Sequence, residues 1–354
     1  MAIVLANQKA CLFSSMLMFY LILLPFLKFI TILKRSFLKK GCSSMCLFKV
    51  SLNKVLNLFL LVFISFLLIG NINAYAANIK VMTYNTNLLP NIPLTPLTQN
   101  LNEPYERARL IPYEIKQHNP DVVVFQEDIA PIMYLILDKN MEKVGYKYKT
   151  EVVGSWDVDN INLLNGGVII YSRYPFNESP QYLILPKSYG WESIANKGAV
   201  FAQVKKRKKL YNIISVHMQS IQVGSSDEEA QVLSWKVQIG ALNQWIANLN
   251  LSADIPLILA GDLNANSGEA IAGEMPMPSA EFPLYQYMLM ALNANYAAPF
   301  APNTLPYSFD GLTDSMNDSI KRETLDHILC ISGYVCADQS QSTINIVALK
   351  SDML

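Results

Sequence analysis

The 354-residue chain is poor in histidine, which occurs three times, and in cysteine, which occurs five times. Three of the cysteines fall in the first 76 residues, so only Cys330 and Cys336 remain in the rest of the chain. These two lack the spacing partners of a zinc site, which excludes a zinc module built on cysteine. Linkers, low-complexity tracts and short repeats are also missing from residues 78–354, so we expect one domain there.

The first 76 residues contain no Asp or Glu, and their eight basic residues are therefore uncompensated. The apolar stretch 56–69 follows Lys49 and Lys54 and precedes Ala74-Tyr75-Ala76. A basic beginning, an apolar centre and a small-x-small end are typical of a secretory signal peptide, here residues 45–76. We therefore expect cleavage after Ala76 and a secreted domain over residues 77–354.

Residues 1–44 contain a second apolar stretch, 11–33, which is about long enough to span a bilayer but includes Lys28. Two interpretations stay open. We favour a start of translation at Met45, which makes residues 1–44 an over-called extension. The alternative is a membrane anchor, with both apolar segments retained.

The charge balance changes when the leader is set aside. Removing its eight basic residues leaves 20 basic against 28 acidic residues, a net charge of −8 for residues 77–354. An acidic surface repels a polyanion and argues against a general nucleic-acid binder, although bound cations could offset the field in a nuclease.

In an oxidising compartment we expect Cys330 and Cys336 to form a disulfide, with two free thiols as the alternative.

Short runs rich in Val, Ile and aromatic residues recur after residue 78 and predict β-strands. They are Ile79–Met82, Val122–Phe125, Val168–Tyr171, Val200–Val204, Tyr211–Val216, Pro256–Ala260 and Leu325–Ile331. Helical spacing of apolar residues predicts helices over Tyr105–His118 and Glu228–Leu249. Several strands are apolar on both faces, which indicates covered sheets, and the alternation of strands with helices predicts an α/β sandwich.

Polar residues stand at the ends of these predicted strands, where a sandwich can gather them into one cleft. They are Asn85, Glu127, His217, Asp262, Asn264 and Asp326. Carboxylate and amide oxygens suit Mg²⁺, which stabilises the charge that develops on phosphate oxygens. Asp262 and Asn264 share a face of an extended segment, so one can orient a water while the other holds phosphate or metal. His217 can donate a hydrogen bond to phosphate, and a protonated imidazole would suit that role.

Seven segments, taken in chain order, resemble the exonuclease–endonuclease–phosphatase superfamily. They are KVMTYNT, PDVVVFQE, GGVIIYSRYPF, NKGAVFAQV, SVHMQS, LAGDLNAN and TLDHIL. The resemblance spans residues 79–331 and implies a deoxyribonuclease I-like, four-layer α/β sandwich, with two mixed β-sheets packed face to face and helices outside. Within the superfamily, the segments Gly166-Gly167, Asn196-Lys197-Gly198, His217-Met218-Gln219 and Tyr307–Asp310 are most similar to secreted bacterial sphingomyelinase C.

This resemblance implies roles for the strand-end residues. The implied catalytic residues are His217, Asp262, Asn264 and Asp326, and the implied metal ligands are Glu127, Asn85, Asp262 and Asn264. Glu127 would be the main Mg²⁺ ligand, with Mn²⁺ or Co²⁺ as substitutes for Mg²⁺. Lys197 and Gly198 would shape the wall beside the headgroup. The implied partner is sphingomyelin or a related phospholipid in a membrane surface, rather than nucleic acid, and the implied state is a monomer.

One departure concerns the last strand of the family, which opens with Ser-Asp-His and supplies a general base. Here the sequence ends Lys350-Ser351-Asp352-Met353-Leu354. Either Met353 stands where the family has His or the sequence stops just before that motif, and in both cases we expect the base and the last strand to be missing. His327 should face away from the cleft because it follows Asp326 in a strand, and His118 should be solvated at a helix end. A general base typically contributes about 10²–10⁴-fold, so we expect impaired turnover.

Three hypotheses for the function remain. The first is a secreted Mg²⁺-dependent sphingomyelinase that yields ceramide and phosphocholine. The second is another phosphodiesterase on the same scaffold, including a nuclease, and the third is an inactive relative that binds membrane or host protein. A nuclease should carry a basic groove, whereas the basic cluster Lys205–Lys209 is expected at a solvated hairpin tip that could also contact anionic lipid. The Met-rich stretch Met275–Met290 could meet a bilayer, and we favour the alternative of a packed loop and helix.

Overall fold

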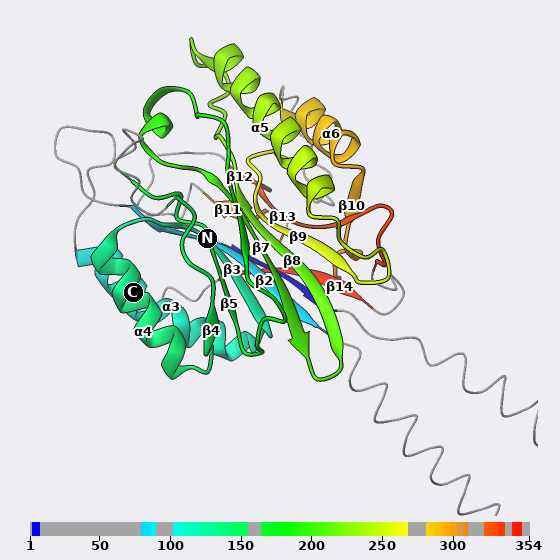
Figure 1. The fold of residues 1–354 in the computed structure, drawn as a ribbon. Helices are drawn as coiled ribbons and strands as arrows, with labels where there is room; N and C mark the ends of the chain where they lie inside the picture. Colours follow the sequence, from blue (N-terminus) through cyan, green and yellow to red (C-terminus); the bar gives the residue numbers. More distant parts are fainter. Residues whose placement is uncertain are drawn as a thin grey trace, which may run out of the picture. The chain divides into compact units, whose positions relative to one another are not determined.

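The computed structural model describes residues 2–7, 79–89, 102–154, 164–267, 281–302, 304–305, 307–310, 322–336 and 342–348. The first of its two large sheets has the strand order β14-β1-β2-β3-β5-β4 (Figure 1). The strands are β1 Ala2–Asn7, β2 Lys80–Leu88, β3 Val122–Asp128, β4 Tyr148–Lys149, β5 Ile169–Ser172 and β14 Thr343–Ala348. The sheet is mixed, because β2 and β3 are parallel while their other pairings are antiparallel.

The second large sheet has the order β10-β13-β9-β8-β7-β6. Its strands are β6 Gln181–Ile184, β7 Gly198–Lys206, β8 Lys209–His217, β9 Leu257–Asp262, β10 Ala294–Tyr296 and β13 Asp326–Ile331. It is mixed too, since β8 and β9 are parallel and the neighbouring pairs are antiparallel. Two short strands, β11 Phe309–Asp310 and β12 Arg322–Glu323, pair separately.

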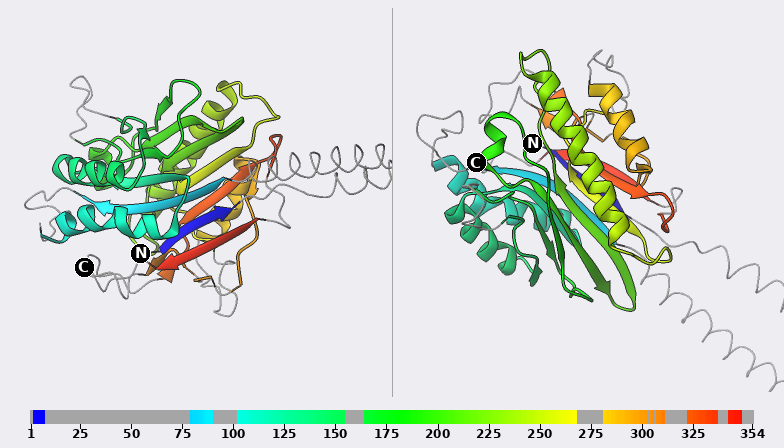
Figure 2. Two further views of the ribbon diagram at one scale, coloured as in Figure 1. Left: turned by 90° about the horizontal axis from the view of Figure 1, so that it is seen from below. Right: turned by 45° about the horizontal axis from the view of Figure 1, so that its top comes forward.

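Helices cover the outer face of each sheet (Figure 2). They are α3 Asn102–His118 and α4 Pro131–Lys143 on the first sheet, and α5 Glu228–Asn248 and α6 Glu281–Ala291 on the second. A 3-10 turn, η2 Gly190–Ile194, precedes β7. The predicted four-layer sandwich, with two mixed sheets face to face and helices outside, is therefore confirmed.

Alternation along the strands builds the three apolar layers. In β3, Val122 and Val124 pack between the sheets, while Val123 and Phe125 pack under α3 and α4. Side chains of a strand alternate between the two faces, so a strand covered on both sides is apolar throughout. The prediction of covered interior strands is confirmed by this packing.

The described elements also bear on the interpretation of the N-terminal residues. Residues 2–7 form β1 between β14 and β2, a strand that sequence analysis did not predict because it assigned residues 1–44 to an extension or a membrane segment. The predicted signal peptide and the cleavage after Ala76 lie outside the described residues and stay predictions. No helix in the described part of the chain is long and apolar enough to cross a membrane.

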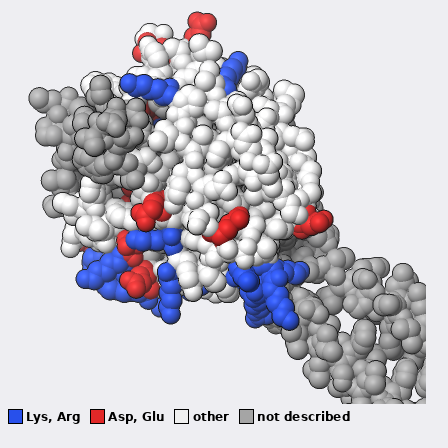
Figure 3. Space-filling view, viewed as in Figure 1, with Lys and Arg blue, Asp and Glu red and all other residues white. Residues whose placement is uncertain are grey.

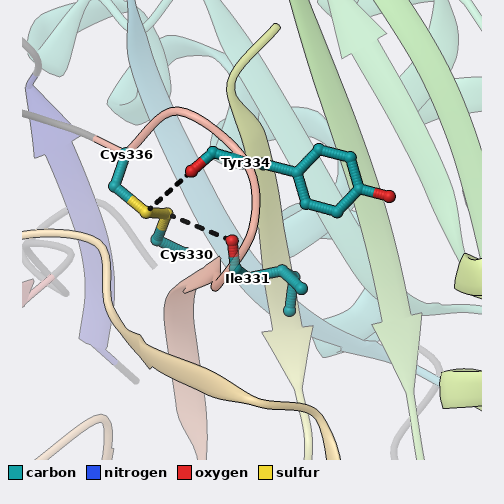
Figure 4. Close-up of a disulfide and its surroundings, with 4 residues drawn as sticks. All are labelled: Cys330, Ile331, Tyr334 and Cys336. Carbon is teal, nitrogen blue, oxygen red and sulfur yellow. Dashed lines mark hydrogen bonds between the residues drawn. A yellow bond between two sulfur atoms is a disulfide. The ribbon is translucent and has the colours of Figure 1, made fainter. Parts of the chain in front are cut away.

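Cys330 and Cys336 form the expected disulfide (Figure 4). Their sulfurs lie near the carbonyl oxygens of Ile331 and Tyr334, at 3.8 and 3.6 Å. Cys330 belongs to β13, so the disulfide fixes the turn that follows this strand at its end remote from Asp326.

Candidate metal and phosphate site

The two sheets bring the predicted site residues to one end of the sandwich. The carboxyl ends of β2 and β3 meet because these strands are parallel, and the ends of β8 and β9 meet for the same reason. His217 and Asp262 are paired across β8 and β9, and Asp326 is paired with Asp262 across β13 and β9. Residues directly opposite each other on antiparallel strands project to the same face, so the Asp262 and Asp326 carboxyls are neighbours.

Asp262 is held from both sides by hydrogen bonds. The Asn85 side chain donates from Nδ2 to Oδ2 of Asp262 at 2.9 Å, which links the first sheet to the second. The backbone N–H of Asn264 donates to Oδ1 of Asp262 at 3.0 Å, and Nδ2 of Asn264 donates to the Met218 carbonyl at 2.9 Å. These bonds fix the orientation of the Asp262 carboxylate and of the Asn264 amide.

Glu127, His217 and Asp262 each offer a ligand atom, and these atoms lie within 4.8 Å of one another. Oε1 of Glu127 is 3.8 Å from Nε2 of His217. His217 and Asp262 are buried, and the Glu127 side chain keeps 21% of its surface exposed, so the cluster opens to solvent on the Glu127 side. Two carboxylates and an imidazole are suitable ligands for a divalent cation.

The backbone at this cluster is strained. Glu127 and Asn264 adopt left-handed conformations, with φ of +58° and +53°. Non-glycine residues rarely occupy this region, and such outliers concentrate at functional sites. Gly167 permits the Glu127 conformation, because a Cβ at Gly167 would lie 2.8 Å from the Glu127 Cα.

Electrostatics also favour a bound cation. Burial raises the pKa of Glu127 to about 7, and it raises the pKa of Asp262 against the opposing effect of the Asn85 hydrogen bond. Burial and the nearby Asp262 charge raise the pKa of Asp326 well above its ordinary value. Oδ1 of Asp326 has no hydrogen-bond partner within the described residues. A cation would offset this concentration of negative charge, so the residues present fit a metal.

His217 differs from its expected protonation state. Its Nε2 lies 3.1 Å from Nζ of Lys197, and burial together with the Lys197 charge holds the pKa of His217 well below its ordinary value. The imidazole is therefore neutral near pH 7, which corrects the expectation that a protonated ring would suit the site. An ammonium group so close makes a second positive charge costly.

Lys197 is more central than the sequence indicated. Its Nζ donates to the Met218 carbonyl at 2.7 Å and to Oε1 of Glu192 at 2.8 Å, in addition to approaching His217. The family resemblance places Lys197 in the wall beside the headgroup and does not predict these contacts. A lysine before a strand carries no sequence signal for such a contact, which depends on the neighbouring strand β8.

The other two histidines lie away from the cluster, as expected. Nε2 of His327 is 2.7 Å from the Ala265 carbonyl, and its ring stacks on Tyr285 on the opposite side of β13. His118 ends α3, where its carbonyl accepts from Nζ of Lys80, at the other end of β2 from Asn85. His118 is partly buried rather than fully solvated. Met353, in the position expected for a family histidine, lies outside the described residues.

Family membership follows from a comparison with known proteins. The sequence pattern of the Endonuclease/Exonuclease/phosphatase family matches residues 82–333, which includes every residue of the cluster. The chain belongs to this family. Among curated proteins, the chain is similar to Sphingomyelinase C 2 of Leptospira interrogans. The two are 32% identical over 203 residues, which cover 54% of this chain and 32% of the relative. Sphingomyelinase C of Listeria ivanovii is 26% identical over 73% of this chain and 75% of its own.

Solved structures in the family agree with the fold. Sphingomyelinase C from Streptomyces griseocarneus superposes with a TM-score of 0.61 at 27% identity, over 74% of this chain and 86% of that one. The matches span only about a third of two Leptospira interrogans relatives, namely 32% of Sphingomyelinase C 2 and 37% of Sphingomyelinase C. The chain is thus a sphingomyelinase-like family member that carries a candidate metal cluster.

Proposed function

We propose that this protein is a secreted, Mg²⁺-dependent phosphodiesterase that hydrolyses sphingomyelin to ceramide and phosphocholine. The single observation that supports the proposal most is the convergence of Asn85, Glu127, His217, Asp262 and Asn264 on one end of the sandwich. Sphingomyelinase relatives at 26–32% identity support the lipid substrate.

Each group has a chemical task in this proposal. Glu127, with Asp262 and Asn85 beside it, would hold the cation, which when bound supplies positive charge to the phosphate oxygens. Asp262 accepts a hydrogen bond from the attacking water and orients it. Asn264 and His217 offer N–H groups to the phosphate, and Lys197 lowers the energy of added negative charge through its ammonium field.

The position of the basic cluster favours a lipid over a nucleic acid. Lys205–Lys209 form the tip of the β7–β8 hairpin, where Lys206 pairs with Lys209 around the turn, as the sequence predicted. Figure 3 shows blue side chains at the lower right of this face, where Figure 1 draws the end of the β7–β8 hairpin. His217 ends β8, so the length of the strand, roughly 27 Å, separates the cluster from the site. A nuclease would place its positive charge beside the reacting phosphate.

A substrate panel tests the proposal. Purified protein is incubated with sphingomyelin, phosphatidylcholine or DNA in the presence of Mg²⁺. A high enzyme concentration is used because His217 is the only imidazole that the described residues bring to the site. We expect phosphocholine and ceramide from sphingomyelin, and no DNA cleavage. Cleavage of DNA in preference to sphingomyelin would favour the nuclease alternative and contradict the lipid assignment.

A further inference from the structure

Four exposed apolar side chains lie on two elements that meet near the site. Tyr189 and Trp191, at the turn η2, are 41% and 60% exposed, and Leu233 and Val237, on α5, are 64% and 50% exposed. Tyr189, Leu233 and Val237 line a groove of about 380 Å³ together with Lys187, Ser188, Ala230 and Ser234. We call Tyr189, Trp191, Leu233 and Val237 the η2–α5 patch. Large apolar side chains exposed as a group indicate an interaction surface.

Hydrogen bonds hold the patch in a fixed shape. The Tyr189 N–H donates to Oε1 of Gln219 at 2.6 Å, and the Gln219 N–H donates to Oε1 of Gln238 at 2.8 Å. Nε2 of Gln238 donates in turn to the Pro186 carbonyl at 2.9 Å and approaches the Ser188 Oγ at 3.2 Å. Buried side chains therefore hydrogen-bond the segment at η2 to α5. The fold holds this segment in place while its aromatic rings stay exposed.

The patch is also tied to the site. Trp191 directly precedes Glu192, whose carboxylate accepts from Nζ of Lys197 at 2.8 Å and from the Ser220 N–H at 2.9 Å. Lys197 in turn lies 3.1 Å from His217. One ion pair therefore separates the exposed tryptophan from the candidate catalytic imidazole.

We propose that the η2–α5 patch docks the protein on a phospholipid bilayer, with Trp191 and Leu233 entering the interface. The inference rests on the proposed function, because a lipid that remains in its bilayer can be reached only if a surface beside the site meets the membrane. Tryptophan and tyrosine favour the membrane–water interface, and leucine and valine favour the hydrocarbon below it. Lys187, exposed in the same groove, complements the lipid phosphates.

Charge near the patch specifies the kind of bilayer. The first turn of α5 carries Glu228 and Glu229, one turn before Leu233. These carboxylates are balanced by Lys187 in the groove and by the exposed Lys236 beside Val237. The patch therefore has no excess of positive charge to attract an anionic surface, and a zwitterionic surface suits it. The patch should therefore bind zwitterionic vesicles, which matches a choline lipid as substrate.

Sedimentation with phosphatidylcholine vesicles that contain no sphingomyelin tests the docking without any turnover. The test variant is Trp191→Ala with Leu233→Ala. The matched control is Ile132→Ala with Leu135→Ala on α4, whose side chains are 67% and 64% exposed on the outer face of the other sheet. We expect the test variant to lose about tenfold or more in vesicle partitioning, and the control to stay within about twofold of the original protein.

A second readout separates docking from chemistry. Hydrolysis of a water-soluble short-chain sphingomyelin should be equal in the original protein and the test variant, while hydrolysis of vesicle sphingomyelin should fall with binding. Unfolding curves check that both variants are folded. Equal vesicle partitioning by the test variant and the original protein, or equal losses in test and control variants, would overturn the docking surface. Patch-dependent vesicle binding without hydrolysis of either substrate would leave the docking surface standing and refute the proposed function.

Discussion

Glu127 combines three properties that suit a metal ligand. It is partly exposed, its backbone is left-handed, and burial of its carboxyl raises its pKa to about 7. A cation binds the ionised carboxylate, so metal binding must displace the proton that Glu127 carries below that pH. The residue thereby links metal affinity to pH.

Replacement Glu127→Gln should weaken Mg²⁺ binding by more than about tenfold without unfolding the protein. In the original protein, affinity should rise as pH increases toward 7 and level off above it, with proton release on binding. Calorimetric titration in two buffers of different ionisation enthalpy measures both effects. Glu178→Gln, at an exposed position in the loop after β5, is the control and should bind Mg²⁺ normally. Unchanged affinity in Glu127→Gln would remove Glu127 from the metal site.

His327 predicts a pH dependence of stability. Burial lowers the pKa of His327 to about 4, against an ordinary value of 6.5, while the Ala265 carbonyl opposes the shift. The folded pKa lies below the unfolded one, so this contribution is complete above pH 6.5 and is lost as pH falls toward 4. The loss amounts to about 3 kcal/mol.

His327→Phe should abolish this contribution, because phenylalanine can still stack on Tyr285 but cannot be protonated. The difference in free energy of unfolding between the original protein and the variant should therefore be constant above pH 6.5 and shift by about 3 kcal/mol toward the variant near pH 4. Chemical denaturation at a series of pH values measures it. A difference that does not change with pH would contradict the buried neutral state of His327.

At the scale of elements, the parallel pair β8–β9 places His217 beside Asp262. This pairing depends on a close contact between Gly261 and Val216, the pair directly before His217 and Asp262. A Cβ at Gly261 would lie 2.1 Å from the Val216 carbonyl oxygen. Gly261 also has φ of +157°, which other residues rarely adopt. The glycine in GDLNAN thus serves the strand pairing, and the aspartate after it serves the site.

Gly261→Ala should lower the free energy of unfolding by at least about 2 kcal/mol, because either β8 or β9 must move to admit the methyl group. The displacement separates His217 from Asp262, so Mg²⁺ affinity should fall as well. Denaturant titration measures the first effect and calorimetry the second. Gly240→Ala on α5 is the control, since open space surrounds a Cβ there. It should leave Mg²⁺ affinity unchanged and raise the free energy of unfolding by about 0.5–1 kcal/mol, because alanine favours a helix interior more than glycine does. A fully stable Gly261→Ala protein would contradict the tight β8–β9 contact.

Some strands and site residues could be predicted from the sequence, and others depend on contacts between elements. Val122–Phe125 was recognised as a strand because both faces are apolar, and Asp262 because it directly follows such a run. The strand β3 continues to Asp128, three residues beyond the apolar run, because tertiary pairing extends it over polar residues. Lys197 was underestimated because its contacts come from β8 and η2, and β1 was missed because an apolar leader segment carries no signal for sheet pairing.

At the scale of the whole molecule, the basic cluster Lys205–Lys209 and the candidate metal site lie at opposite ends of β8. The basic hairpin tip lies at one end of β8 and the buried carboxyls at the other. The net charge of −8 for residues 77–354 fits a zwitterionic substrate better than a polyanion. Replacing Lys205, Arg207 and Lys208 by Gln should therefore leave sphingomyelin hydrolysis within about twofold of the original rate, as a fluorescent-substrate assay would measure. A loss well beyond this would place the hairpin in substrate binding.

We propose that the cluster around Asp262 is the metal-dependent centre of a lipid phosphodiesterase. The most direct measurement is release of phosphocholine from sphingomyelin by the original protein and by Asp262→Asn, each with Mg²⁺ and with a chelator. We expect release by the original protein only when Mg²⁺ is present, and a loss of at least about 100-fold in Asp262→Asn or with the chelator. Equal release by the original protein and Asp262→Asn, or release that persists in the chelator, would contradict it.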